Sequence, residues 1–121
     1  MKIRLLEIEF GSKDLEKSKL FYNSILGLET SVEQDGLKVF NSGVNGIDFN
    51  TSTHFPPKTG VTSFLTNNLQ DVIDRLTENN IIFNGPKNSH LGMKTIEFND
   101  LDGYLIKVNQ PTVESPSWLK V

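Results

Sequence analysis

The segment from Lys94 to Gln110 constrains the fold of this chain more than any other stretch, because it predicts a tight hairpin. Its turn, Asp100-Leu101-Asp102-Gly103, combines aspartates that bond to their own backbone with a glycine that accepts a positive φ. Apolar residues alternate on both sides of the turn, and this period of two indicates a half-buried antiparallel pair of strands. The apolar face carries Ile96, Phe98, Tyr104, Ile106 and Val108.

The opposite face of the predicted hairpin is mostly polar. It carries Thr95, Glu97, Leu105, Lys107 and Asn109. Charged residues in the middle of a strand face either solvent or a cavity, and the choice between these two decides the function.

Composition excludes several classes of protein. The 121 residues fit one domain that is large enough to bury a core. The net charge of −3 and the lack of a basic run argue against nucleic-acid binding. No cysteine is present, so disulfides, a thiol nucleophile and a thiolate metal site are excluded. No apolar run approaches the roughly 20 residues that cross a bilayer, and no signal-peptide core opens the chain, so we expect a cytoplasmic location.

The first half of the chain predicts a strand, a helix and three strands. Alternation over Ile3–Phe10 indicates the first strand, and Ser12 or Asp14 can cap the helix that follows. The helix ends at Leu26-Gly27, where glycine supplies a left-handed cap. Its apolar stripe is Leu15, Ser18, Phe21, Tyr22 and Ile25. Three strand-like runs follow near Glu29–Gln34, Leu37–Asn41 and Gly46–Asn50, separated by Asp35-Gly36 and Ser42-Gly43.

The second half repeats this order after a linker at Thr51–Gly60. It predicts a strand at Val61–Thr66, a helix capped by Asn67 or Asn68 and ended by Asn79-Asn80, a strand at Ile81–Phe83, a loop at Gly85–Gly92 and then the hairpin. The repeat indicates an internal duplication. A ferredoxin-like sandwich fits less well, because it needs one strand after its second helix and this chain offers three.

Two motifs resemble the vicinal oxygen chelate superfamily, the group of glyoxalase I, bleomycin-resistance proteins, fosfomycin-resistance enzymes and extradiol dioxygenases. They are D-L-E-K-S-K-L-F-Y-N-S-I-L-G-L-E at Asp14–Glu29 and N-D-L-D-G-Y-L-I-K-V at Asn99–Val108. The resemblance implies an α+β fold of two βαβββ modules that form a cup-shaped mixed β-sheet, commonly completed by a homodimer. We therefore expect one glyoxalase/bleomycin-resistance-like domain over residues 1–110, with modules 1–54 and 60–110, and a C-terminal tail at 111–121.

The resemblance also implies where metal ligands stand in the enzymes of the superfamily. The corresponding positions here are Glu7, Asp48, Val61 and Lys107, whereas glyoxalase-like enzymes have His or Glu at these places. Valine has no lone pair to offer, and an ammonium group has only donors. We therefore expect no metal and no cofactor.

We expect Lys107 to replace the cation and to pair with Glu7 or Asp48, because a charge removed from water persists only when it is paired. The same alignment and the strand alternation predict which side chains line the cup. They are Glu7, Asp48, Glu97, Lys107, Ser63 and Leu105. The alternative is a salt-bridged cluster that only preserves the shape of the cup.

The remaining candidate residues have ordinary structural explanations. His54 and His90 lie in predicted loops and are surface residues unless they overhang the cup, where either could donate a hydrogen bond or act as a general base. Trp118 can cap a pocket, cover a dimer seam or lie in solvent. The spacing of four aromatic residues places them in the core: Phe21, Tyr22, Phe64 and Phe98.

These observations favour a metal-independent protein that binds a small molecule, and the excess of acids in the cup favours a cationic drug or metabolite. The alternative is a divalent-metal-dependent lyase, isomerase or dioxygenase that uses the carboxylates of Glu7, Asp48 and Glu97. A third interpretation is a structural or protein-interaction module whose cup is collapsed. We expect a binding protein rather than an enzyme.

Overall fold

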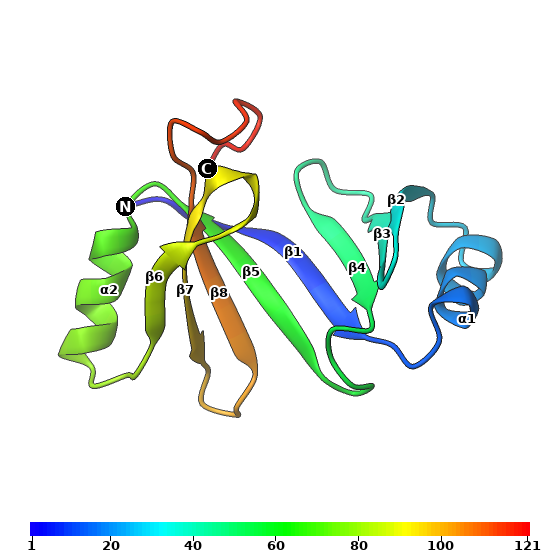
Figure 1. The fold of residues 1–121 in the computed structure, drawn as a ribbon, viewed down its shortest axis with the longest axis horizontal. Coiled ribbons are helices and arrows are strands. Elements are labelled where there is room, and N and C mark those ends of the chain that lie inside the picture. The colour runs from blue at the N-terminus through cyan, green and yellow to red at the C-terminus, as the bar shows by residue number, and fades with distance from the viewer. The chain divides into compact units, whose positions relative to one another are not determined.

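The computed structural model describes all 121 residues and shows the order strand, helix, three strands twice over (Figure 1). The fold is therefore α+β with two βαβββ modules, as the sequence repeat predicts. The elements are β1 Ile3–Gly11, α1 Leu15–Lys19, the π-helix η1 Leu20–Ile25, β2 Thr30–Gln34, β3 Leu37–Asn41, β4 Asp48–Ser52, β5 Gly60–Thr66, α2 Leu69–Glu78, β6 Asn84–Asn88, the 3-10 helix η2 His90–Gly92, β7 Lys94–Asn99 and β8 Leu105–Gln110.

The chain divides into two compact units. The N-terminal unit is Leu6–Thr62, and the C-terminal unit joins Met1–Leu5 to Ser63–Val121, so β1 and β5 have residues in both. Within the N-terminal unit the strand order is β2-β3-β4-β1, with β1 parallel to β4. Within the C-terminal unit the order is β5-β8-β7-β6. No helix is both long enough and apolar enough to span a membrane.

Helix α1 covers one face of the N-terminal sheet. The Asp14 carboxylate accepts from the backbone N–H groups of Glu16 and Lys17, which confirms Asp14 as one of the two predicted caps. The Ser18 hydroxyl then donates to Thr51 Oγ1 on β4 at 2.8 Å. On the same face five aromatic rings contact one another: Phe10, Phe21, Tyr22, Phe40 and Phe49.

The predicted helical stripe of the first module is only partly correct, because the helix changes its period. After Lys19 the backbone continues as a π-helix, in which the N–H of Leu26 donates to the carbonyl of Phe21. The wider turn rotates later residues away from the sheet. Tyr22 still packs on Phe40 and Phe49, whereas Ile25 is 65% exposed and Phe21 is also exposed.

Helix α2 covers one face of the C-terminal sheet, and this packing forms the main core. Leu69, Val72 and Leu76 pack against Ile96 and Val108. Partly buried residues complete the cluster: Phe64, Ile73, Phe83, Phe98 and Ile106. The apolar face of the predicted hairpin is thus confirmed, apart from Tyr104, which lies before β8 and is exposed.

The predicted strand at Ile81–Phe83 and the predicted loop at Gly85–Gly92 are wrong. The sixth strand is β6, and all five of its residues are exposed. It has no apolar alternation because it is an edge strand held by backbone pairing with β7, where Pro86 is tolerated. Ile82 is apolar but 89% exposed, since the chain leaves α2 there through the left-handed residue Asn80.

The strand predicted at Gly46–Asn50 lies two residues later, at β4. The linker before β5 is correspondingly shorter than the predicted Thr51–Gly60, because Thr51 and Ser52 are buried members of β4.

The C-terminal tail packs back on its own unit. Leu119 is 6% exposed, and the carbonyl of Lys120 accepts from Arg4 Nε at 2.7 Å. The Thr112 hydroxyl donates to the carbonyl of Gly92 at 2.6 Å. Trp118, in contrast, is 66% exposed. The anchor of the tail is therefore Leu119, which has no periodic neighbours to indicate it in the sequence.

We expect Leu119→Ala to lower the free energy of unfolding by about 2 kcal/mol, the low end for a buried leucine because a chain terminus relaxes around the lost volume. The matched control is Trp118→Ala. Because this side chain is exposed, its removal should change the free energy of unfolding by less than about 0.5 kcal/mol. Urea denaturation measures both. Equal midpoints for the two variants would contradict this account of the tail.

Candidate functional site

One face of the N-terminal sheet is free of helix and carries acids. Glu7 of β1 and Asp48 of β4 are direct register partners, and Glu9 is the partner of Asn50. The register of β4 with β3 adds aliphatic and polar neighbours. The residues of β1, β3 and β4 on this face are Glu7, Glu9, Gly11, Leu37, Val39, Asn41, Asp48, Asn50 and Ser52. We call this set the acidic face; the alternation that predicts Glu7 and Asp48 on one side of their strands is confirmed.

Asn50 is the most deeply buried polar group of the acidic face that lacks a full set of partners. The residue is 4% exposed, and its Nδ2 donates to Glu7 Oε2 at 3.1 Å. Its carbonyl Oδ1 is buried and accepts no hydrogen bond. Leaving such a group unsatisfied costs about 1–3 kcal/mol, so a buried amide oxygen of this kind calls for an explanation.

Asp48 lies next to Asn41 and Glu7 across the strands. The residue as a whole is exposed, yet the protein around it withdraws part of the water from its carboxyl group. This desolvation raises the pKa of Asp48 above its usual value, because it disfavours the charged form.

Glu9 forms a second polar cluster on the acidic face. Its Oε2 accepts from the Ser52 hydroxyl at 2.9 Å and lies 3.3 Å from His54 Nδ1. Ser52 Oγ in turn accepts from the backbone N–H of His54 at 3.3 Å. His54 is therefore held by a carboxylate instead of being isolated in a loop. Glu9 is not among the predicted cup-lining residues, although it follows Glu7 by two positions and so shares its face.

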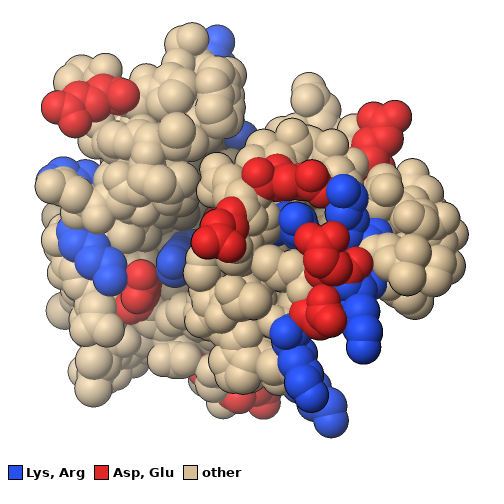
Figure 2. All heavy atoms as spheres, turned by 45° about the vertical axis from the view of Figure 1, so that its right-hand side comes forward, with Lys and Arg blue, Asp and Glu red and all other residues tan.

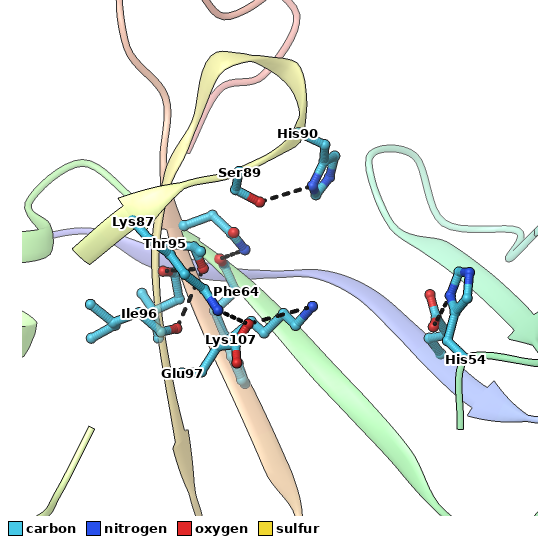
Figure 3. Close-up of polar contacts among 12 residues, drawn as sticks. His54, Phe64, Lys87, Ser89, His90, Thr95, Ile96, Glu97 and Lys107 are labelled. Carbon is cyan, nitrogen blue, oxygen red and sulfur yellow. Dashed lines mark hydrogen bonds and ion pairs between the residues drawn. The ribbon is translucent and has the colours of Figure 1, made fainter. Parts of the chain in front are cut away.

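Two lysines flank one glutamate in the C-terminal unit (Figure 3). Glu97 Oε1 lies 3.1 Å from Lys87 Nζ and 3.8 Å from Lys107 Nζ. Glu97 and Lys107 are register partners on β7 and β8, which confirms that they share a face. All three side chains are partly exposed, so each pair contributes at most about 1 kcal/mol. The electrostatic partner that the structure records for Lys107 is Glu97.

Around this ion-pair group the helix-free face of the C-terminal sheet is well buried. Ser63 is buried and Leu105 half-buried. Asn109, the register neighbour of Thr95, donates from Nδ2 to the carbonyl of Phe64 at 3.1 Å, and its Oδ1 has no partner. Asn50 lies two residues after Asp48, and Asn109 lies two residues after Lys107. The repeat therefore places a buried amide at the same point of each module.

On the face drawn in Figure 2 the charged residues do not form a single-sign patch. Figure 2 shows acidic and basic side chains interleaved over the face in view. In the N-terminal unit Glu33 pairs with Lys19 at 2.5 Å and lies 3.9 Å from Lys38.

His90 and Trp118 both belong to the C-terminal unit and are exposed. His90 begins η2 and its Nδ1 lies 3.1 Å from the Ser89 hydroxyl (Figure 3), a local contact typical of a surface histidine. Nothing in its surroundings assigns it a role.

The residues at the four family positions do not suit a bound metal. Glu7 and Asp48 are adjacent carboxylates, but Val61 is a buried apolar residue and the Lys107 side chain lies 3.8 Å from Glu97 Oε1. A divalent ion would have to displace or deprotonate that ammonium. No group of three or more His, Asp or Glu side chains converges within either unit. The predicted pairing of Lys107 with Glu7 or Asp48 joins residues of both units and stays a prediction, as does the complete cup.

Comparison with known proteins identifies the fold. The model of the Glyoxalase/Bleomycin resistance protein/Dioxygenase superfamily matches residues 4–108. A superfamily member from Vibrio splendidus 12B01 is 18% identical with a TM-score of 0.67, over 90% of this chain and 98% of that one. Methylmalonyl-CoA epimerase from Mycobacterium tuberculosis is 14% identical with a TM-score of 0.64, over 89% and 87% of the two chains.

A variant of homoprotocatechuate 2,3-dioxygenase from Brevibacterium fuscum is 18% identical with a TM-score of 0.66, over 91% of this chain and 33% of that larger one. No curated protein sequence matches the chain. At these identities the solved structures share the fold with this protein, and the fold hosts several reactions. Because the family model spans most of the sequence, this chain belongs to the glyoxalase/bleomycin resistance protein/dioxygenase superfamily.

Proposed function

We propose that this protein binds a small organic molecule without a metal ion, and that the ligand carries a positive charge. The observation that carries the proposal is the acidic face, where Glu7, Glu9 and Asp48 share one side of β1 and β4 with the buried amide of Asn50. Carboxylates accept hydrogen bonds and cannot donate them when ionised. A cationic group brings positive charge and hydrogen-bond donors to these carboxylates.

The state of Asp48 supports this proposal. Its carboxyl group is partly desolvated, and the raised pKa means that ionisation of this group costs more free energy in the folded protein than in water. A bound cation would favour that ionised form and lower the pKa again. Binding would thus recover free energy that the free protein loses at this residue.

The absence of suitable metal ligands at two family positions supports metal independence. Lys107 and Val61 stand where the resemblance implies donors, and Lys107 forms an ion pair with Glu97. The ammonium group and a divalent ion would repel each other at this position.

The second candidate is a divalent-metal-dependent lyase, isomerase or dioxygenase. The specific observation in its favour is the direct pairing of Glu7 with Asp48, two oxygen ligands of the kind that Mg²⁺ and Mn²⁺ prefer. A homodimer and a cytoplasmic location, which the resemblance and the composition imply, also stay predictions.

We expect cationic compounds to raise the melting temperature in a thermal-shift screen against size-matched anions. A ligand at 100 times its Kd contributes about 2.7 kcal/mol, which corresponds to several degrees for a domain of this size. The effect should fade as the pH falls, because protonation of Asp48, whose pKa is raised, removes a negative charge from the acidic face. Stabilisation by anions alone would contradict the proposal.

Lys107→Glu should create affinity for a divalent ion that the natural protein lacks, since it replaces the ammonium with a carboxylate at a family ligand position. Calorimetric titration with Mn²⁺ and Ni²⁺ measures the gain. The matched control is Lys87→Glu, which makes the same charge change beside the same Glu97 but lies on the edge strand β6. No gain in Lys107→Glu, or an equal gain in both variants, would show that these positions do not meet at a former metal site.

A further inference from the structure

We propose that the positive group of the ligand is an ammonium or guanidinium that carries N–H bonds, and that it donates to the buried Oδ1 of Asn50 beside Glu7. A quaternary ammonium, which has no N–H, should bind poorly. This inference rests on the proposed function and narrows its ligand to one chemical class.

The orientation of the Asn50 amide follows from its neighbour. Nδ2 lies 3.1 Å from Glu7 Oε2, and an ionised carboxylate can only accept, so the amide nitrogen must face Glu7. The amide oxygen is thereby directed elsewhere on the same face. It is buried, on a residue 4% exposed, and no group of the chain donates to it. The group that completes Asn50 must therefore be a hydrogen-bond donor.

The carboxylates around Asn50 favour a positively charged donor. Its register partner on β1 is Glu9, and Glu7 and Asp48 stand one pair further along the same face. Glu9 Oε2 already accepts from Ser52 and lies 3.3 Å from His54 Nδ1, so it has polar partners within the chain. Asp48 has no ion pair in the structure and its carboxyl is partly desolvated. A neutral donor would satisfy Asn50 and leave Asp48 uncompensated, whereas a cation serves both.

The side chains of the acidic face select against a quaternary cation. Such ligands are bound over the faces of aromatic rings. None of the nine residues that form the acidic face is aromatic. The interlocking rings of Phe10, Tyr22 and Phe49 lie on the opposite, helix-covered face. The carboxylate and amide oxygens of the acidic face accept hydrogen bonds, which an ammonium or guanidinium can donate and a quaternary ammonium cannot.

Two probes with the same ring and charge test the proposal: benzylammonium, with three N–H bonds, and benzyltrimethylammonium, with none. Each is titrated into ¹⁵N-labelled protein while the side-chain amide signal of Asn50 is followed, the signal being assigned by its loss in Asn50→Leu. We expect benzylammonium to move this signal and to bind at least about tenfold more tightly than its trimethyl analogue, because only the former can donate. Equal affinity within about threefold, or binding of benzylammonium that leaves the Asn50 signal unmoved, would overturn the inference.

The matched variants are Asn50→Leu and Asn109→Leu, which remove equivalent buried amides from the two modules. Benzylammonium should lose about tenfold in affinity with the first and stay within about twofold with the second. If Asn50→Leu fails to fold, the ratio of the two probes on the natural protein still decides the question.

The outcome also separates this inference from the proposed function. Equal binding of the two probes overturns the N–H requirement and leaves a cation-binding protein. Failure of benzylammonium to bind overturns the inference, while the proposed function fails only if no cation of the thermal-shift screen stabilises the protein.

Discussion

Strand register is the constraint on which the rest of this structure depends. Because side chains alternate along a strand, the pairing of Ile96 with Val108 on β7 and β8 also pairs Glu97 with Lys107 on the opposite face. A shift of one residue would place the charged pair against α2 and the apolar pair outside. The apolar cluster under α2 therefore holds the charged residues where they are, and the same logic places Glu7 beside Asp48 in the N-terminal unit.

The two modules use equivalent positions for different chemistry. Asp48 and Lys107 hold corresponding places on the last strands, and each is followed two residues later by a buried asparagine with an unpartnered oxygen. The N-terminal unit surrounds its asparagine with carboxylates, whereas the C-terminal unit has a glutamate shared by two lysines. The acid at this position in one module and the base in the other thus contribute to an acidic face and a mixed one. This asymmetry underlies both the metal-free proposal and the choice of a cationic ligand.

Features that depend on residues close together in the sequence were predictable. The hairpin at Lys94–Gln110, the caps Asp14 and Asn68 and the two helix-covered faces all follow from alternation and capping chemistry. The strand β6 was not predictable, because Asn84–Asn88 has no apolar alternation and forms a strand only through its pairing with β7. The π-helix was missed for a related reason, since its extra residue per turn leaves the composition unchanged.

For the candidate site, strand alternation placed Glu7, Asp48, Glu97 and Lys107 on the polar sides of their strands. It did not single out Asn50, whose significance lies in burial and in an unpaired oxygen. The contact of Glu9 with His54 likewise depends on how the chain after β4 turns back toward β1. Such details follow from three-dimensional packing and have no signal in the sequence pattern.

The acidic face is proposed to recognise its ligand without a metal ion. Elemental analysis of tag-free protein, before and after incubation with Mn²⁺, Fe²⁺, Ni²⁺ and Zn²⁺, tests it most directly. The ion pair of Lys107 with Glu97 and the apolar Val61 predict no stoichiometric retention of any of these ions. Retention of one ion per chain would contradict the account and make a metal-dependent enzyme the leading interpretation.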